Sequence, residues 1–191
     1  MDRFDLTCTN TGVLLIDMQE RFLPAIPAMA HEQSCGRGAR LLLDGATLLG
    51  LPTLITEQYP TGLGPTLPHL LAAAPSAALA TKTHFSCLDD PKLRLRHADD
   101  HRTHVVVAGV EAHVCVLATV SDLIASGKWV VVAADAVASR DPQHRDLALA
   151  AMRDLGALVL PVESILFRLQ RQAGVGVFKQ LSALVKASGA I

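Results

Sequence analysis

The sequence predicts a three-layer α/β/α sandwich built on a mainly parallel, Rossmann-like sheet of six strands. Short apolar runs rich in Val, Leu, Ile and Ala alternate with longer segments of helical periodicity. Such runs are typical of strands buried on both faces, and their alternation with helices predicts right-handed crossovers that cover both faces of the sheet. No repeat, low-complexity tract or linker interrupts this order, so we expect one domain spanning residues 1–191.

The two patterns place the expected elements along the chain. Strands are expected at residues 12–17, 52–56, 77–82, 104–110, 129–134 and 157–160. Helices are expected at residues 31–50, 66–74, 91–100, 113–126, 142–155 and 163–187. The longest irregular stretch, Tyr59 to Pro68, follows the second strand. It leaves the carboxyl edge of the sheet, where it can line or cover a site.

The composition favours an intracellular enzyme over a nucleic-acid-binding or membrane protein. A net charge of −1, from 17 basic and 18 acidic residues, gives no electrostatic basis for binding nucleic acid. The first residues lack the basic start and apolar run of a signal peptide, and no apolar stretch approaches the roughly 20 residues that cross a bilayer. The four cysteines show no paired spacing. We therefore expect a cytoplasmic protein without membrane contacts or structural disulfides.

A cysteine follows the fourth expected strand after a tight turn. The segment from His104 to Cys115 places Cys115 in the first turn of the next helix. Amides of a first helical turn have no carbonyl partner and carry partial positive charge, so we expect a Cys115 thiolate and a backbone site for an oxyanion. Free cysteine is also a common small buried residue, so this position alone leaves a structural role open.

Two charged residues end other expected strands. Asp17 follows the apolar run that begins at Gly12, and Lys82 follows the run that begins at Ala77. Because the carboxyl ends of parallel strands share one edge of the sheet, we expect both to lie near Cys115. The three side chains would then supply a proton acceptor, a cation and a nucleophile.

These residues lie in segments that resemble the isochorismatase-like cysteine hydrolases, a family that also includes the nicotinamidases. The resemblance covers most of the chain and rests on three segments: Val13 to Phe22, Thr81 to Cys87 and Gly109 to Cys115. It implies a catalytic triad of Asp17, Lys82 and Cys115. It also implies a cis peptide bond between Val110 and Glu111, which together with Cys115 would shape the oxyanion site.

A further segment distinguishes two branches of this family. Residues 56–64 resemble the isochorismatase-domain-containing hydrolases, whose physiological substrates are poorly defined. The nicotinamidase branch carries there an Asp and two His that bind a metal, whereas this chain has Glu57, Gln58 and Tyr59. One carboxylate falls short of the three or four ligands that a stable transition-metal site needs. We therefore expect neither a metal nor a cofactor.

Residues next to the triad in sequence are candidates for substrate contact. They follow either Asp17, the second strand or Lys82: Gln19, Phe22, Gln58, Tyr59, His84 and Phe85. A pocket role and a packing role are equally compatible with the sequence at the loop after Lys82. His113 precedes Cys115 by two residues and does not face it, so we interpret this histidine as structural.

The predicted activity is that of a cysteine hydrolase acting on a small amide, imide or related carbonyl substrate. Cys115 would form an acyl-enzyme, while Asp17 moves protons and Lys82 supplies positive charge. Two alternatives stay open. One is isochorismatase-type hydrolysis of a vinyl ether, using Asp17 without a thiol nucleophile. The other is a catalytically idle protein that binds a small molecule or serves in an assembly.

The partners expected are a small-molecule substrate and further copies of the chain. Residues 163–191 carry more apolar positions than one amphipathic helix needs to cover a sheet of this size, and the family resemblance implies oligomers. Part of this segment, or the apolar loop from Leu63 to Leu71, would be buried against another copy, most simply about a two-fold axis. The alternative is that both segments fold back on their own sheet.

Overall fold

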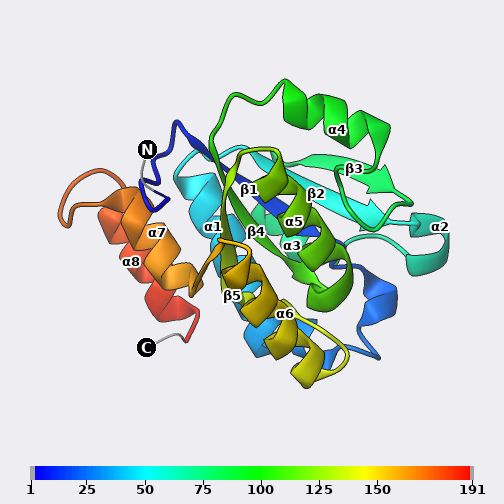
Figure 1. Ribbon diagram of the computed structural model, residues 1–191. Helices are drawn as coiled ribbons and strands as arrows, with labels where there is room; N and C mark the ends of the chain where they lie inside the picture. The colour runs from blue at the N-terminus through cyan, green and yellow to red at the C-terminus, as the bar shows by residue number, and fades with distance from the viewer. Residues whose placement is uncertain (1–2, 190–191) are drawn as a thin grey trace.

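The computed structural model describes residues 3–189 and confirms the α/β class (Figure 1). Its strands form one sheet in the order β3-β2-β1-β4-β5-β6, and every neighbouring pair is parallel. The strands are β1 (Thr11–Ile16), β2 (Thr53–Gln58), β3 (Ala78–Lys82), β4 (His104–Val110), β5 (Trp129–Ala138) and β6 (Leu158–Leu160). All six lie within a few residues of the expected positions.

Helices cover both faces of the sheet. One face carries α1 (Ser34–Leu48), α3 (Pro68–Ala73), α7 (Val162–Gln170) and α8 (Phe178–Ala187), and the other carries α4 (Pro91–Ala98), α5 (Leu117–Ala125) and α6 (Pro142–Asp154). Alternate residues of a strand enter opposite cores, as in β1, where Leu15 packs toward α1 and Leu14 toward α5. The short pieces are the 3₁₀ turns η1 (Glu20–Phe22) and η2 (Pro27–Met29) and the helix α2 (Pro60–Leu63).

The C-terminal segment is two helices rather than the single one expected at 163–187. The chain breaks after α7, where Arg171 has a φ of 62° and Gly174 a φ of 78°. Both values lie in the left-handed region, which ends a helix. The break lets α8 turn back beside α7 and pack against α1 (Figure 1).

This arrangement uses much of the apolar surface of the C-terminal segment within the chain itself. The apolar side chains of α7 and α8 are mostly buried in their own chain, including Ile165, Leu166 and Leu181, each 0% exposed. In the loop from Leu63 to Leu71, Leu70 is also fully buried. The apolar excess of these segments is explained by their packing on α1, because two helices need two apolar faces.

No helix among residues 3–189 combines the length and the apolar character that crossing a bilayer requires.

One glycine sets how closely β4 approaches β1. Gly109 has a φ of 146°, and a Cβ built on it would lie 2.3 Å from the backbone oxygen of Ile16. Only glycine fits this approach, because a Cβ cannot lie that close to an oxygen to which it is not bonded. Gly109 is the residue opposite Ile16 in the parallel ladder. The contact therefore fixes the end of β4 against the residue that precedes Asp17.

Replacing this glycine should destabilise the fold. We expect Gly109→Ala to lower the free energy of unfolding by about 3 kcal/mol, since the added methyl group meets backbone rather than a mobile side chain. Gly127→Ala is the matched control: Gly127 also has a positive φ, 90°, but a Cβ there meets nothing within 4 Å. Its cost should be nearer 1 kcal/mol. Urea titrations that give equal losses for the two variants would contradict the steric argument.

Candidate active site

Asp17 lies directly after β1 and is almost completely buried. Its backbone is left-handed, with a φ of 58°, which turns the chain sharply at the carboxyl edge of the sheet. Thr56 Oγ1 donates to Asp17 Oδ1 over 2.8 Å, and Lys82 Nζ donates to Asp17 Oδ2 over 2.6 Å. Both carboxylate oxygens therefore accept from neighbouring strands, and the group is held in one orientation.

Lys82 ends β3 and is also buried, with its ammonium group enclosed by oxygen atoms. Besides Asp17, Nζ donates to Gln58 Oε1 over 2.8 Å and to the backbone oxygens of His84 and Phe85, each over 3.3 Å. The side chains of Lys82 and Asp17 are 0% and 1% exposed. A buried ammonium is tolerated only when it is paired and hydrogen-bonded, and this one is both.

Cys115 lies in a π-helical turn, η3 (Ala112–Val116), that leads into α5. Burial, followed by the negative charge of Asp17, raises the pKa of the thiol to about 12, although the charge of Lys82 acts to lower it. The expectation of a resting thiolate is therefore wrong. The physical reason is that Lys82 is already neutralised by Asp17, so the thiol is exposed to the carboxylate as much as to the cation.

The structure brings the three side chains together without the expected cis bond. No cis peptide bond occurs among residues 3–189, so the bond between Val110 and Glu111 is trans. The sharp turn after β4 is made instead by Glu111, whose φ of 53° and ψ of 59° are left-handed. The left-handed dihedral angles of Glu111 therefore turn the chain without a cis peptide bond.

Sequence reasoning missed Thr56 as a part of this site. Thr56 is fully buried and lies opposite Ile16 in the ladder, so its hydroxyl reaches the carboxylate of Asp17. The sequence pattern that identified Asp17 and Lys82 also applies to Thr56, because it too is a polar residue at the end of an expected buried strand. A second thiol, Cys87, lies close by: burial raises its pKa to about 11, and the charge of Lys82 opposes this.

Two of the expected substrate-contact residues are used by the protein itself. Gln19 is fully buried; its amide nitrogen donates to the backbone oxygens of Gln58 (3.0 Å) and Gly64 (2.6 Å), and its oxygen accepts from the Gln58 amide over 2.7 Å. Gln58 binds Lys82 through Oε1 and donates through Nε2 to the backbone oxygen of Thr83. Gln19 thus joins the segment after β1 to the end of β2 and the loop after it, and Gln58 joins the end of β2 to the end of β3.

The remaining candidates differ in exposure. Phe22 is half-buried against the core on the α1 face, which indicates a packing role. Tyr59, His84 and Phe85 are exposed, with Tyr59 57% and Phe85 62% accessible. They follow β2 and β3, the strands that carry Thr56 and Lys82. Exposed aromatic rings beside a buried ion pair are therefore available to an incoming molecule.

The segment that holds a metal in the nicotinamidase branch has another use here. Glu57 Oε1 accepts from the backbone amide and the hydroxyl of Thr66, over 2.7 and 2.9 Å, so Glu57 anchors the start of α3. Among residues 3–189, no group of three or more His, Cys, Asp or Glu side chains is arranged to hold a metal ion.

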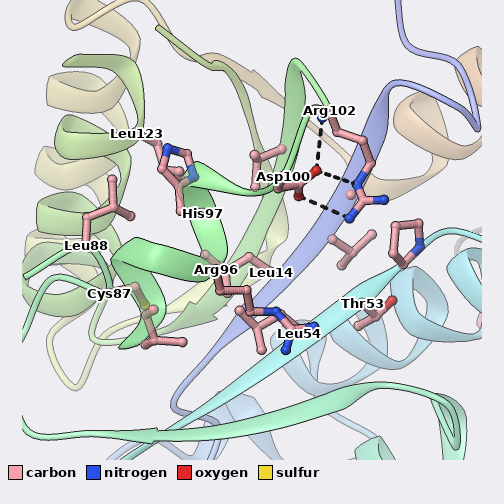
Figure 2. Close-up of a pocket in the computed structure, with 15 residues that line it drawn as sticks. Leu14, Thr53, Leu54, Cys87, Leu88, Arg96, His97, Asp100, Arg102 and Leu123 are labelled. Carbon is pink, nitrogen blue, oxygen red and sulfur yellow. Dashed lines mark hydrogen bonds and ion pairs between the residues drawn. The ribbon is translucent and has the colours of Figure 1, made fainter. Parts of the chain in front are cut away.

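A separate cavity of about 90 Å³ lies between α4 and the sheet (Figure 2). It is walled by apolar side chains such as Leu14, Leu54 and Leu93, and Asp100 and Arg102 form an ion pair at one end. It exists because α4 is short and buries only Leu93. None of Asp17, Lys82 and Cys115 lines it, so this cavity is not the pocket of the candidate site.

The fold is a parallel α/β sheet with an acid, a lysine and a cysteine at its carboxyl edge. The family model of the isochorismatase domain matches residues 11–164. The chain therefore belongs to the isochorismatase-like hydrolase family, and it is a hydrolase.

Relatives and solved structures agree with this assignment. Isochorismatase domain-containing protein 2 of Danio rerio is 34% identical over 180 residues, covering 94% of this chain and 89% of that protein. Isochorismatase domain-containing protein 2A of Mus musculus is 37% identical, covering 91% and 82%. The structure of MAR1 ribonuclease from Caenorhabditis elegans superposes with a TM-score of 0.87 at 34% identity, covering 95% of this chain and 92% of that one.

The raised pKa of Cys115 has a direct consequence for labelling. At pH 7.5, iodoacetamide should modify the exposed Cys8 far faster than Cys115, because only the thiolate reacts. Asp17→Asn removes the negative charge that raises this pKa, so it should speed the labelling of Cys115. Lys82→Met removes the cation that lowers the pKa and should slow it.

Peptide mass spectrometry over a range of pH measures these rates. Asp90→Asn is a control of the same chemistry, since Asp90 caps α4 and contacts none of the triad. Preferential labelling of Cys115 in the unmodified protein at pH 7.5 would contradict a resting thiol.

Proposed function

We propose that the chain hydrolyses a small amide, imide or related carbonyl compound through an acyl-enzyme on Cys115. The observation that carries the proposal is the buried ion pair of Asp17 and Lys82, placed so that the charge of Asp17 acts on the Cys115 thiol. A carboxylate kept in place beside a protonated thiol is the arrangement that general-base activation of a nucleophile requires.

The first half of the reaction forms the acyl-enzyme. Asp17 accepts the thiol proton as Sγ attacks the substrate carbonyl carbon, and the carbonyl oxygen becomes an oxyanion. The free amides of the turn that leads into Cys115 would donate to it. The tetrahedral intermediate then collapses, and Asp17 returns the proton to the leaving amine. Lys82 keeps Asp17 oriented and balances its charge when the carboxylate is ionised.

The second half releases the product. A water molecule gives a proton to Asp17 and attacks the thioester, and the acid product leaves as Cys115 regains its proton. The exposed Tyr59, His84 and Phe85 would contact the substrate at the mouth of the site. The segment with Glu57, Gln58 and Tyr59 lacks the Asp and two His that bind a metal in the nicotinamidase branch. The reaction is therefore proposed to need neither a metal nor another cofactor.

The alternative of vinyl-ether hydrolysis is less well supported. That reaction needs Asp17 to donate a proton to the substrate. Both oxygens of Asp17 accept hydrogen bonds from Thr56 and Lys82, which is the environment of a proton acceptor. A nucleic-acid substrate is also not proposed, since the net charge of −1 offers no attraction to a phosphate backbone. The described cysteines are free, which suits the reducing cytoplasm we propose for this enzyme.

Substitutions should show that the three residues act as one unit. Cys115→Ala should abolish amide turnover, and Asp17→Asn or Lys82→Met should lower kcat by about 10³-fold or more. A double variant should lose little more than its worse single variant. The assay is ammonia release from a panel of small amides and cyclic imides, with an acid quench and mass spectrometry of the Cys115 peptide to detect a thioester.

Asp90→Asn again serves as the control and should retain full turnover. If the loss of log kcat in a double variant equals the sum of the losses in its two single variants, the residues act in separate sites. Amide turnover that survives in Cys115→Ala would contradict the acyl-enzyme, and hydrolysis of an added vinyl-ether substrate by that variant would favour the vinyl-ether alternative. A chain that gives neither turnover nor an adduct across the panel would point to the idle binding protein.

We also propose that the chain associates with further copies of itself, through α6 rather than the C-terminal helices. A groove between α5 and α6 is lined by Val114, Leu117 and Leu155. Leu155, which directly follows α6, is 45% exposed, and Leu147 of α6 is 69% exposed. Exposed apolar side chains beside an apolar groove are typical of an interface between subunits.

Light scattering tests this association. The unmodified chain should give a multiple of its 20.3 kDa mass at micromolar concentration, and Leu155→Glu should lower it by placing a charge in the contact. Leu95→Glu is the matched control, because Leu95 is 68% exposed on α4, away from this groove. A monomeric unmodified chain, or an equal effect of both variants, would refute the proposed contact.

A further inference from the structure

A buried carboxylate beside the Cys115 turn has no part in the reaction described above. Glu111 immediately precedes η3 and is 6% exposed. Its backbone is left-handed, with a φ of 53°, a conformation that Glu adopts rarely because its Cβ crowds the following carbonyl. A charged residue that is both buried and strained needs a compensating interaction.

Arg140, in the loop after β5, supplies that interaction. Arg140 Nε lies 2.8 Å from Glu111 Oε1, and the arginine side chain is 64% exposed while the carboxylate side chain is 8% exposed. Arg140 follows β5, so the ion pair joins the turn after β4 to the loop after β5. It is a charge-assisted contact with one partner out of water, which makes it stronger than a surface pair.

The position of the second carboxylate oxygen of Glu111 depends on this ion pair. Glu111 Oε2 is buried and has no hydrogen-bond partner among the described residues; it lies 3.4 Å from His113 Nδ1. His113 Nδ1 is itself 3.0 Å from Ser139 Oγ, so the histidine has another partner. Arg140 is therefore the contact that keeps the carboxylate of Glu111 in place.

We propose that Glu111 is a positioning residue whose ion pair with Arg140 holds the turn that aims backbone amides at the oxyanion. The dihedral angles of Glu111 set the direction of the amides that follow it, and the turn closes on Glu111 itself through the Val114 amide, which donates to its carbonyl oxygen over 2.8 Å. This inference rests on the proposed role of Cys115 as nucleophile.

A small aldehyde separates oxyanion binding from thiol reactivity. When Cys115 adds to propanal, Sγ bonds to the carbonyl carbon and the thiol proton passes through Asp17 to the carbonyl oxygen, giving a hemithioacetal without any oxidant or reductant. Its oxygen occupies the place of the oxyanion. Alkylation by iodoacetamide forms a sulfur–carbon bond and releases iodide, so it requires no oxyanion site.

The experiment measures both properties on the folded, full-length chain. Propanal at increasing concentration protects Cys115 from iodoacetamide at pH 9, and mass spectrometry of the Cys115 peptide gives the alkylation rate and the propanal affinity. Arg140→Gln should weaken the affinity about tenfold or more, because a charged hydrogen bond is lost, and leave the alkylation rate without propanal within about twofold. Glu111→Gln should behave in the same way.

Arg153→Gln is the matched control, because Arg153 is an exposed arginine of α6 and should change neither quantity. Because Arg140 is exposed, its substitution leaves the core unchanged, so the test does not depend on a variant that fails to fold. Equal propanal affinity in the unmodified chain and both variants would overturn the positioning role. Equal losses of affinity and of alkylation rate would also overturn it, as a general distortion of the site. No protection in the unmodified chain would overturn the proposed function first.

Discussion

The buried ion pair between Asp17 and Lys82 is the interaction on which the arrangement of the site depends. Neither side chain is solvated, and bringing each charge out of water costs several kcal/mol that only a close partner and further hydrogen bonds offset. The partners come from three adjacent strands: Asp17 after β1, Thr56 and Gln58 on β2, and Lys82 on β3. The ladder aligns Ile16 with Thr56 and Gln58 with Lys82. A slip of one residue in either register would move a charge to the opposite face of the sheet, so the site and the strand register require each other.

Cys115 is brought to this pair by β4, through backbone features that few residues permit. Gly109 allows β4 to lie against Ile16 closer than a side chain would, and Glu111 then reverses the chain in a left-handed conformation. Asp17 makes the equivalent turn after β1. The two strand ends that meet at the site thus both contain a residue in a rare conformation. Strained backbone of this kind persists only where surrounding contacts hold it, and here the contacts are ion pairs formed by the same two residues.

The electrostatics of the site favour a protonated thiol at rest. An amide-rich helix start and a nearby lysine would stabilise a thiolate, but burial and the carboxylate of Asp17 outweigh them. A thiol is less easily oxidised than a thiolate, because oxidation to the sulfenic acid begins from the thiolate. In the proposed reaction, the proton on Cys115 would have to be transferred as the sulfur attacks, and this is the role proposed for Asp17. Lys82 is bound to Asp17, and its charge lowers the thiol pKa by less than burial and Asp17 raise it.

The sequence by itself determined the α/β class, the approximate position of all six strands and the candidate residues Asp17, Lys82 and Cys115. Apolar runs and strand-end polar residues are local signals, and a parallel sheet gathers strand ends at one edge whatever the details of packing. Four features depended on tertiary structure: the thiol pKa, the trans turn at Glu111, the hydrogen bonds that occupy Gln19 and Gln58, and the fold-back of the C-terminal helices. Each depends on which groups approach across strands or helices distant in the chain, and periodicity along the chain does not contain those distances. A pKa in particular is the sum of burial and of charges from β1 and β3, and these contributions exist only once the sheet has formed.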